Sequence, residues 1–266
     1  MPFLPPEFAP VAPLLILLGL FVLLQLLAHA ALTSIIEAAR SWHAVPWLTG
    51  WIGVPVHELS HAAVARLLGR RIRQVRLFAP DPSTGMLGYV VYEDGQGPAA
   101  WLVSLLTGLA PIAGSALALH GLLLGGAWLA HVEPPAAAPA GAWTHHGATA
   151  LVDASQHAVR ITLSLWNKGG WWRAGSVGLW YAAAAIAAHG VPSREDTRGA
   201  WKGLMIVALL AGGVWGICRL LHTDITPQLA RAAAWTTSFL APSLTMGALS
   251  LIALWLIATL VRHLRS

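Results

Sequence analysis

The residues of this chain best suited to chemistry are His57, Glu58 and His61, which form the pattern H-E-x-x-H within an apolar stretch. Residues four apart share one face of a helix, so both imidazoles can reach one metal ion. Two histidines, one carboxylate and an open position form the usual hydrolytic zinc site. Zinc lowers the pKa of its bound water to about 7, and Glu58 is placed to act as the general base. Chance predicts only about 0.01 such patterns in a chain of this composition.

The composition is that of a polytopic membrane protein. The chain has 266 residues, of which 56% are hydrophobic and 10% are charged. Apolar runs long enough to cross a bilayer recur, which predicts an all-α protein of about six transmembrane helices. We expect a single domain over residues 1–266, with its core at about 44–221. The net charge of +5 comes mostly from Arg residues at the ends of these runs, which indicates contact with the lipid bilayer and not with nucleic acid.

Hydropathy places the expected spans at about 11–32, 44–68, 101–130, 176–189, 201–221 and 232–260. The first run has no basic leader, so we expect a retained span and not a cleaved signal. With both termini in the cytoplasm, most Lys and Arg residues lie on the inner side, as the positive-inside rule favours. Residues 143–173 have an interfacial composition. In this topology the H-E-x-x-H pattern and Asp196 lie near the same, cytoplasmic side.

A short β-hairpin is expected over residues 70–93, directly after the motif helix. Polar and apolar residues alternate over 70–78, a turn-rich stretch follows at 80–85, and the run at 87–92 is typical of a second strand. An extended peptide can pair with the open edge of such a sheet, which makes Gly88, Tyr89 and Val90 candidates for substrate binding. A purely structural hairpin explains the same pattern equally well.

A hydrolytic zinc site needs a third protein ligand, and the sequence offers few acidic residues for this role. Glu195 and Asp196 begin a helix that is expected to enter the membrane from the same side as the motif. Asp196 is therefore a candidate ligand. An acidic residue in the first turn is also stabilised by the helix dipole without any metal, so spacing alone leaves both interpretations open.

These motifs resemble those of the site-2-protease-type intramembrane zinc metalloproteases, and more closely a bacterial and archaeal branch of that family. The resemblance covers about residues 50–205. It rests on four elements in the order of that branch, which are Gly53 with the motif His57-Glu58-Leu59-Ser60-His61-Ala62, then Gly88-Tyr89-Val90, then Gly108-Leu109-Ala110-Pro111 with Gly114, and finally Pro192-Ser193 with Asp196 and Gly199-Ala200. The first element is strongly specific, and the others are individually weak.

The resemblance implies a zinc-dependent intramembrane endopeptidase of a prokaryotic inner or plasma membrane. Its substrates are expected to be membrane-embedded or membrane-proximal proteins or peptides. Zinc is expected on His57, His61 and Asp196, with Glu58 as the general base. The chain departs from the better-studied members, which carry their aspartate in the pattern N-x-x-P-x-x-x-L-D-G. Its only asparagine, Asn167, begins no such pattern, which leaves the assignment of Asp196 open.

Three other interpretations fit parts of the sequence. The prenyl-protein-type and stress-induced membrane proteases also carry H-E-x-x-H, but they have an acidic ligand in a helix soon after it, and no such pattern follows here. A catalytically inactive membrane scaffold of the same fold would keep the spans, although here His57, Glu58 and His61 are intact. A transporter would also carry intramembrane polar residues, but the sequence has no paired, interrupted repeats.

Overall fold

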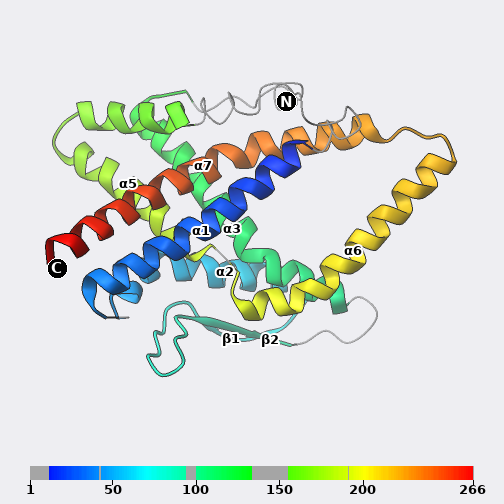
Figure 1. Ribbon diagram of the computed structural model, residues 1–266, viewed down its shortest axis with the longest axis horizontal. Coiled ribbons are helices and arrows are strands. Elements are labelled where there is room, and N and C mark those ends of the chain that lie inside the picture. Colours follow the sequence, from blue (N-terminus) through cyan, green and yellow to red (C-terminus); the bar gives the residue numbers. More distant parts are fainter. Residues whose placement is uncertain (1–11, 42, 94–99, 134–154, 191, 266) are drawn as a thin grey trace.

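A computed structural model describes residues 12–41, 43–93, 100–133, 155–190 and 192–265 of the chain (Figure 1). The described part is mostly helical and contains a two-stranded antiparallel sheet after the motif helix, as the sequence predicts. The helices are α1 (Ala12–Ala39), α2 (Trp51–Leu67), α3 (Ala100–Ala130), α5 (Trp171–His189), α6 (Arg194–Leu220) and α7 (Thr226–Arg265). A further helical segment covers residues 155–167, whereas 143–154 of the expected interfacial stretch lie outside the described residues.

Three helical stretches of the described residues are long and apolar enough to cross a membrane, namely Ala100–Ala130, Ala200–Cys218 and Leu240–Arg265. They correspond to the expected third, fifth and sixth spans, and they suggest a membrane protein. The expected number of about six spans is not confirmed. α2 has only 17 residues and carries the polar motif, and α5 begins with an exposed tryptophan pair and Arg173, so neither is a continuous apolar span.

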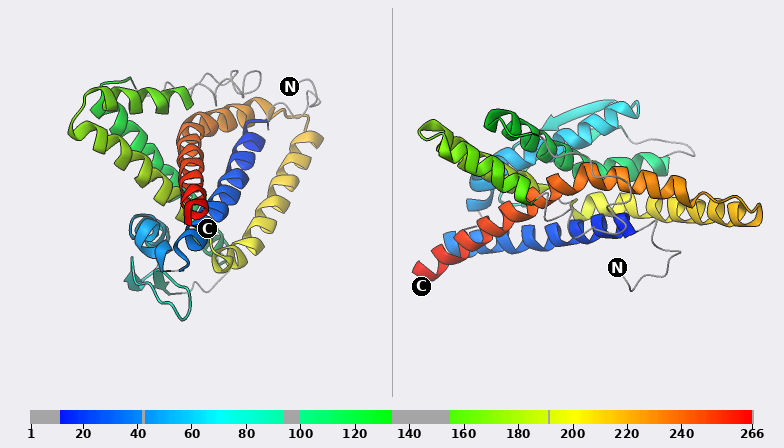
Figure 2. Two further views of the ribbon diagram at one scale, coloured as in Figure 1. Left: turned by 60° about the vertical axis from the view of Figure 1, so that its left-hand side comes forward. Right: turned by 90° about the horizontal axis from the view of Figure 1, so that it is seen from above.

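The core lies where α1 and α7 run side by side and pack against α3 and α5 (Figures 1 and 2). Its fully buried side chains include Leu119, Leu123, Met246 and Leu251. The second half of α5 is buried throughout over residues 183–188, and five of these six residues are alanine. Small side chains allow neighbouring helices to approach closely, which suits a central helix in a membrane protein.

Gly53 allows α2 to pack in direct contact with α5. A Cβ atom on Gly53 would lie 2.2 Å from the carbonyl oxygen of Ala185 and 2.7 Å from the His189 ring, so no larger residue fits there. A short π-helical stretch, Pro46–Gly50, leads into α2. α2 begins at Trp51 and continues through Pro55, which lies inside the helix.

The sheet consists of β1 (Ile72–Arg76) and β2 (Tyr89–Tyr92), within the range predicted for the hairpin. Ile72 pairs with Tyr92 and Arg76 with Tyr89, and a bulge interrupts the register after Ile72. In the connecting turn, the Asp81 carboxylate accepts hydrogen bonds from the backbone and hydroxyl of Ser83 and from the hydroxyl of Thr84, at 2.7–3.0 Å. These bonds lower the pKa of Asp81 below its usual value and order the turn.

α6 leaves the bundle at the side of the molecule that carries the sheet, and a short connection at its far end leads into α7 (Figures 1 and 2). Only 7% of the apolar stretch within Ala200–Cys218 is buried inside the molecule. Its first turns pack on α3, where a Cβ atom on Gly108 would lie 2.5 Å from the carbonyl oxygen of Asp196. α3 therefore fixes the position of Asp196, while most of α6 is exposed.

Candidate metal centre

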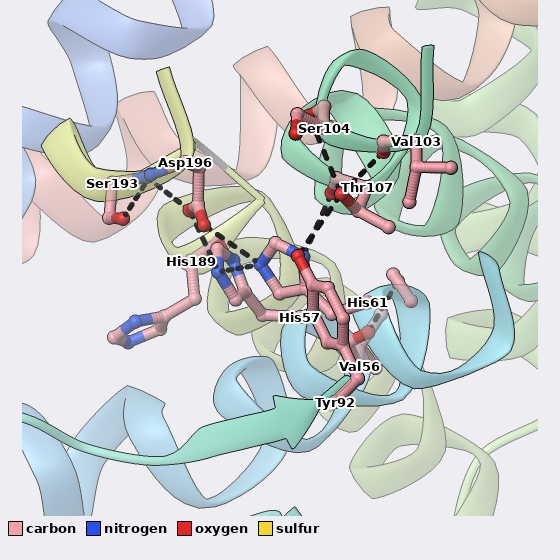
Figure 3. A network of polar contacts seen from close by, with 11 residues as sticks. Val56, His57, His61, Tyr92, Val103, Ser104, Thr107, His189, Ser193 and Asp196 are labelled. Carbon is pink, nitrogen blue, oxygen red and sulfur yellow. Dashed lines mark hydrogen bonds and ion pairs between the residues drawn. The ribbon is translucent and has the colours of Figure 1, made fainter. Parts of the chain in front are cut away.

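The imidazoles of His57 and His61 converge from one face of α2, as their spacing predicts (Figure 3). Their Nε2 atoms lie 3.2 Å apart. Both side chains are largely enclosed, with exposed fractions of 13% for His57 and 9% for His61. Two imidazoles held this closely inside a protein need a shared proton or a cation between them, because their lone pairs repel.

The Nδ1 atom of each imidazole is bound to a backbone carbonyl from another helix. Nδ1 of His57 lies 2.8 Å from the carbonyl oxygen of His189, and Nδ1 of His61 lies 2.9 Å from that of Thr107. A carbonyl oxygen only accepts, so each Nδ1 must carry the hydrogen. In the neutral rings both Nε2 atoms then carry a lone pair and face each other. This tautomer is the one that binds a metal through Nε2.

Asp196 approaches the same point from the first turn of α6. Its Oδ1 atom lies 3.2 Å from Nε2 of His61, and its Oδ2 atom lies 3.5 Å from Nε2 of His57 (Figure 3). Ser193 orients it through a reciprocal capping box. The Ser193 backbone N–H donates to Oδ2 at 2.7 Å, and the Ser193 hydroxyl accepts from the Asp196 N–H at 3.2 Å. Ser193 is thus the N-cap of α6.

These three side chains form a donor set whose spacing can be compared with that around a zinc ion. Ligand atoms about 2.0–2.1 Å from a tetrahedral zinc are separated from one another by roughly 3.3 Å. The two Nε2 atoms here lie 3.2 Å apart, and each lies near a different carboxylate oxygen, Nε2 of His61 at 3.2 Å from Oδ1 and Nε2 of His57 at 3.5 Å from Oδ2. His57, His61 and Asp196 could therefore hold a metal ion. Glu195, the neighbouring acid, is exposed and is not part of this group.

A cavity of about 870 Å³ opens onto these side chains. Glu58 also lines the cavity, and only 7% of its surface is exposed. The cavity is also lined by residues 84–87 of the turn, by Gly88, and by Tyr89 and Val90 at the start of β2. The candidate base and the candidate substrate-binding residues thus face the same space as the donor set.

Two residues that contribute to the site were missed in the sequence, because they act through backbone carbonyls. Thr107 and His189 accept the Nδ1 hydrogens of the two imidazoles, and a carbonyl group has no side-chain signature. Comparisons with protein-family models, curated proteins and solved structures find no match for this chain. Its function is therefore inferred from the chemistry of the site itself.

Proposed function

We propose that this protein is a zinc-dependent intramembrane endopeptidase of the site-2-protease type. The observation that carries the proposal is the convergence of two Nε2 lone pairs and one carboxylate at zinc-like separations. The donor set lies in a mostly helical chain with three apolar helices long enough to cross a membrane. Ionisable groups gathered at such a place are costly unless they serve a function.

The proposed roles follow from the position of each side chain. His57, His61 and Asp196 hold the metal, and the two carbonyl-bound Nδ1 atoms keep the imidazoles in the ligand tautomer. Bound zinc would supply an acidified water and a positive charge opposite the developing oxyanion. Glu58 accepts the proton of the attacking water as the C–O bond forms. It then passes this proton to the amine nitrogen as the C–N bond breaks.

Substrates are proposed to be membrane-embedded or membrane-proximal segments that bind in an extended form. A transmembrane helix hides its carbonyl groups in its own hydrogen bonds, so it must unwind before hydrolysis. β2 lines the cavity, whereas β1 does not, so the free edge of β2 is the natural place for such a segment to pair. Gly88, Tyr89 and Val90 are the proposed contact residues.

The nearest rival classes are less well supported. The acidic group that meets the imidazoles comes from α6, far along the chain, whereas the other H-E-x-x-H membrane proteases take theirs from a helix soon after the motif. An inactive scaffold has no need of a buried glutamate beside an ordered donor set. We place the protein in a prokaryotic inner or plasma membrane, with both termini and the metal centre towards the cytoplasm.

The direct test is the variant Glu58→Gln, compared with wild type in membranes of a host that lacks the endogenous protein. The amide keeps the size of the side chain but accepts no proton, so zinc content should be unchanged and cleavage should fall by at least about 100-fold. Mass spectrometry of protein N-termini should find new termini within or near transmembrane segments only with the wild type.

Glu37→Gln serves as the matched control, because it changes an exposed glutamate of α1 that neither belongs to the donor set nor lines the cavity. It should give the wild-type pattern of new termini. Equal patterns for wild type and Glu58→Gln would contradict the assignment of the general base. Zinc binding without any Glu58-dependent terminus would favour the inactive scaffold.

A further inference from the structure

The carbonyl that accepts the hydrogen bond from His61 has no donor of its own within its helix. In an α-helix the carbonyl of residue 107 is paired with the N–H of residue 111. Residue 111 is Pro111, which lies inside α3 and has no N–H group. The Thr107 carbonyl is therefore left for a donor from outside α3, and Nδ1 of His61 lies 2.9 Å from it.

The His189 carbonyl, which accepts the hydrogen bond from His57, also lacks a partner within its own helix. His189 is the last residue of α5, and terminal carbonyls of a helix have no intrahelical partner. A continued helix would bring the N–H of Ser193 to it, but that group donates to Asp196 instead. The His189 ring is itself anchored, with its Nε2 atom 3.0 Å from the Thr49 hydroxyl.

The surroundings of Thr107 leave little room for an alternative to this bond. Thr107 is 1% exposed, so water cannot easily replace a missing partner for its carbonyl. Its hydroxyl donates to the Val103 carbonyl at 2.7 Å and accepts from the Tyr92 hydroxyl at 3.1 Å (Figure 3). The side chain is thus occupied elsewhere, and the carbonyl and the imidazole are each other's partners.

We propose that Pro111 is a positioning residue for the metal centre, which acts by reserving the Thr107 carbonyl for His61. An N–H at position 111 would pair with that carbonyl along the helix and compete with Nδ1 of His61. A neutral imidazole without this acceptor is free to carry its hydrogen on Nε2, where it cannot bind a metal. The inference rests on the proposed metal centre, and it assigns to this proline a role beyond bending α3.

The test is Pro111→Ala, which restores the missing N–H, with Pro242→Ala as the matched control. Both prolines are buried and lie inside long helices, but Pro242 is in α7, away from the donor set. Zinc affinity is measured in detergent by competition with a chelator. We expect Pro111→Ala to bind zinc about 10- to 100-fold more weakly, as is typical when the partner of a ligating histidine is lost. Pro242→Ala should stay within about twofold of wild type.

A second readout does not require the metal. Nitrogen NMR of ¹⁵N-histidine-labelled, metal-free protein reports which ring nitrogen carries the hydrogen, with signals assigned from His57→Gln and His61→Gln. In the metal-free wild type Nδ1 of both rings should carry a hydrogen, whereas in Pro111→Ala Nδ1 of His61 should carry it only part of the time. His57 should keep its Nδ1–H form, because the His189 carbonyl is unchanged. A general loosening of the fold would change both rings alike.

Unchanged zinc affinity in Pro111→Ala would overturn the proposal. So would equal changes at both histidines, or an equal loss of affinity in Pro242→Ala. If the wild type itself bound no zinc, the proposed function would fail. The His61 signal would then still show whether Pro111 controls its tautomer, so the two failures are distinguishable.

Discussion

At the scale of single residues, the centre depends on hydrogen bonds that orient ligands. Each side chain of the proposed centre is held by a hydrogen bond to a neighbour, as Asp196 is by Ser193 and His61 by the Thr107 carbonyl. A donor set ordered in this way loses little conformational entropy when a metal binds. The position of Asp196 depends most on the packing of helices, since this residue belongs to α6 and both histidines belong to α2.

Replacing Asp196 therefore gives a residue-scale prediction. Wild type purified in detergent without chelator should contain about one zinc per chain, and Asp196→Ala should contain close to none after dialysis, because two imidazoles alone hold zinc weakly. Elemental analysis measures the ratio. Glu195→Ala removes the adjacent, exposed acid and should retain zinc. Full zinc content in Asp196→Ala would mean that the third ligand lies elsewhere.

How far these residues are predictable from the sequence depends on how local their geometry is. His57 and His61 meet because any α-helix brings residues four apart together, so their spacing is sufficient. Asp196 meets them only through the packing of α6 on α3, which spacing cannot encode, and its first-turn position had an ordinary explanation as well. The capping role of Ser193 depends only on local sequence, whereas the two carbonyl acceptors depend on how three helices cross.

At the scale of elements, the hairpin is fitted closely onto the motif helix. A Cβ atom on Gly88 would lie 2.9 Å from Cγ of Glu58, 2.9 Å from a methyl group of Val54 and 2.8 Å from the Arg76 carbonyl oxygen. The backbone before β2 thus rests directly on the proposed base. Any side chain at position 88 must push the hairpin away from α2 or displace Glu58.

Gly88→Ala is accordingly expected to impair cleavage while zinc content stays at the wild-type level. The added methyl group displaces Glu58, and since a displacement of about 1 Å can cost about 100-fold in rate, Glu58-dependent cleavage should fall by roughly 10- to 100-fold. Gly125→Ala is the control, because the added methyl group meets nothing within 4 Å. Normal cleavage by Gly88→Ala would show that the fit of the hairpin on Glu58 is not needed for activity.

The elements themselves were predictable where one pattern dominates a short stretch. Alternation gave the hairpin, and long apolar runs gave α3 and the apolar parts of α6 and α7. The start of α2 is not evident from the sequence, because Pro55 is typical of a first helical turn, whereas in the structure the π-helical stretch leads into a helix that begins at Trp51. The short fourth run became α5, whose buried alanines are placed by packing and not by length.

At the scale of the whole molecule, the centre joins a packed body to an exposed helix. His57 and His61 belong to α2, which packs against α3 and α5, whereas Asp196 belongs to α6, which packs chiefly on α3 through its first turns. Only 7% of the apolar stretch of α6 is buried, so few contacts hold this helix. A metal bound to both α2 and α6 would therefore add substantially to the attachment of α6.

Removal of the metal should therefore loosen the start of α6 selectively. With metal at 100 times its dissociation constant, its loss weakens the attachment by about 2.7 kcal/mol, or about 100-fold in the opening equilibrium. Hydrogen exchange should accelerate over residues 194–203 after chelation and change little in α7. Asp196→Ala should exchange rapidly there with or without chelator. Identical exchange in the metal-bound and metal-free wild type would contradict a metal-linked attachment.

The distribution of the ligands along the chain also has a consequence for biosynthesis. α2 leaves the ribosome early, but Asp196 follows only after β1, β2, α3 and α5 have been made. Throughout that interval the nascent chain carries its two histidines and Glu58 without the third ligand. The proposed peptidase would therefore lack its third ligand while α3 and α5 are being made. It would gain activity only after the first turn of α6 has been made, and until then it could not cut its own helices.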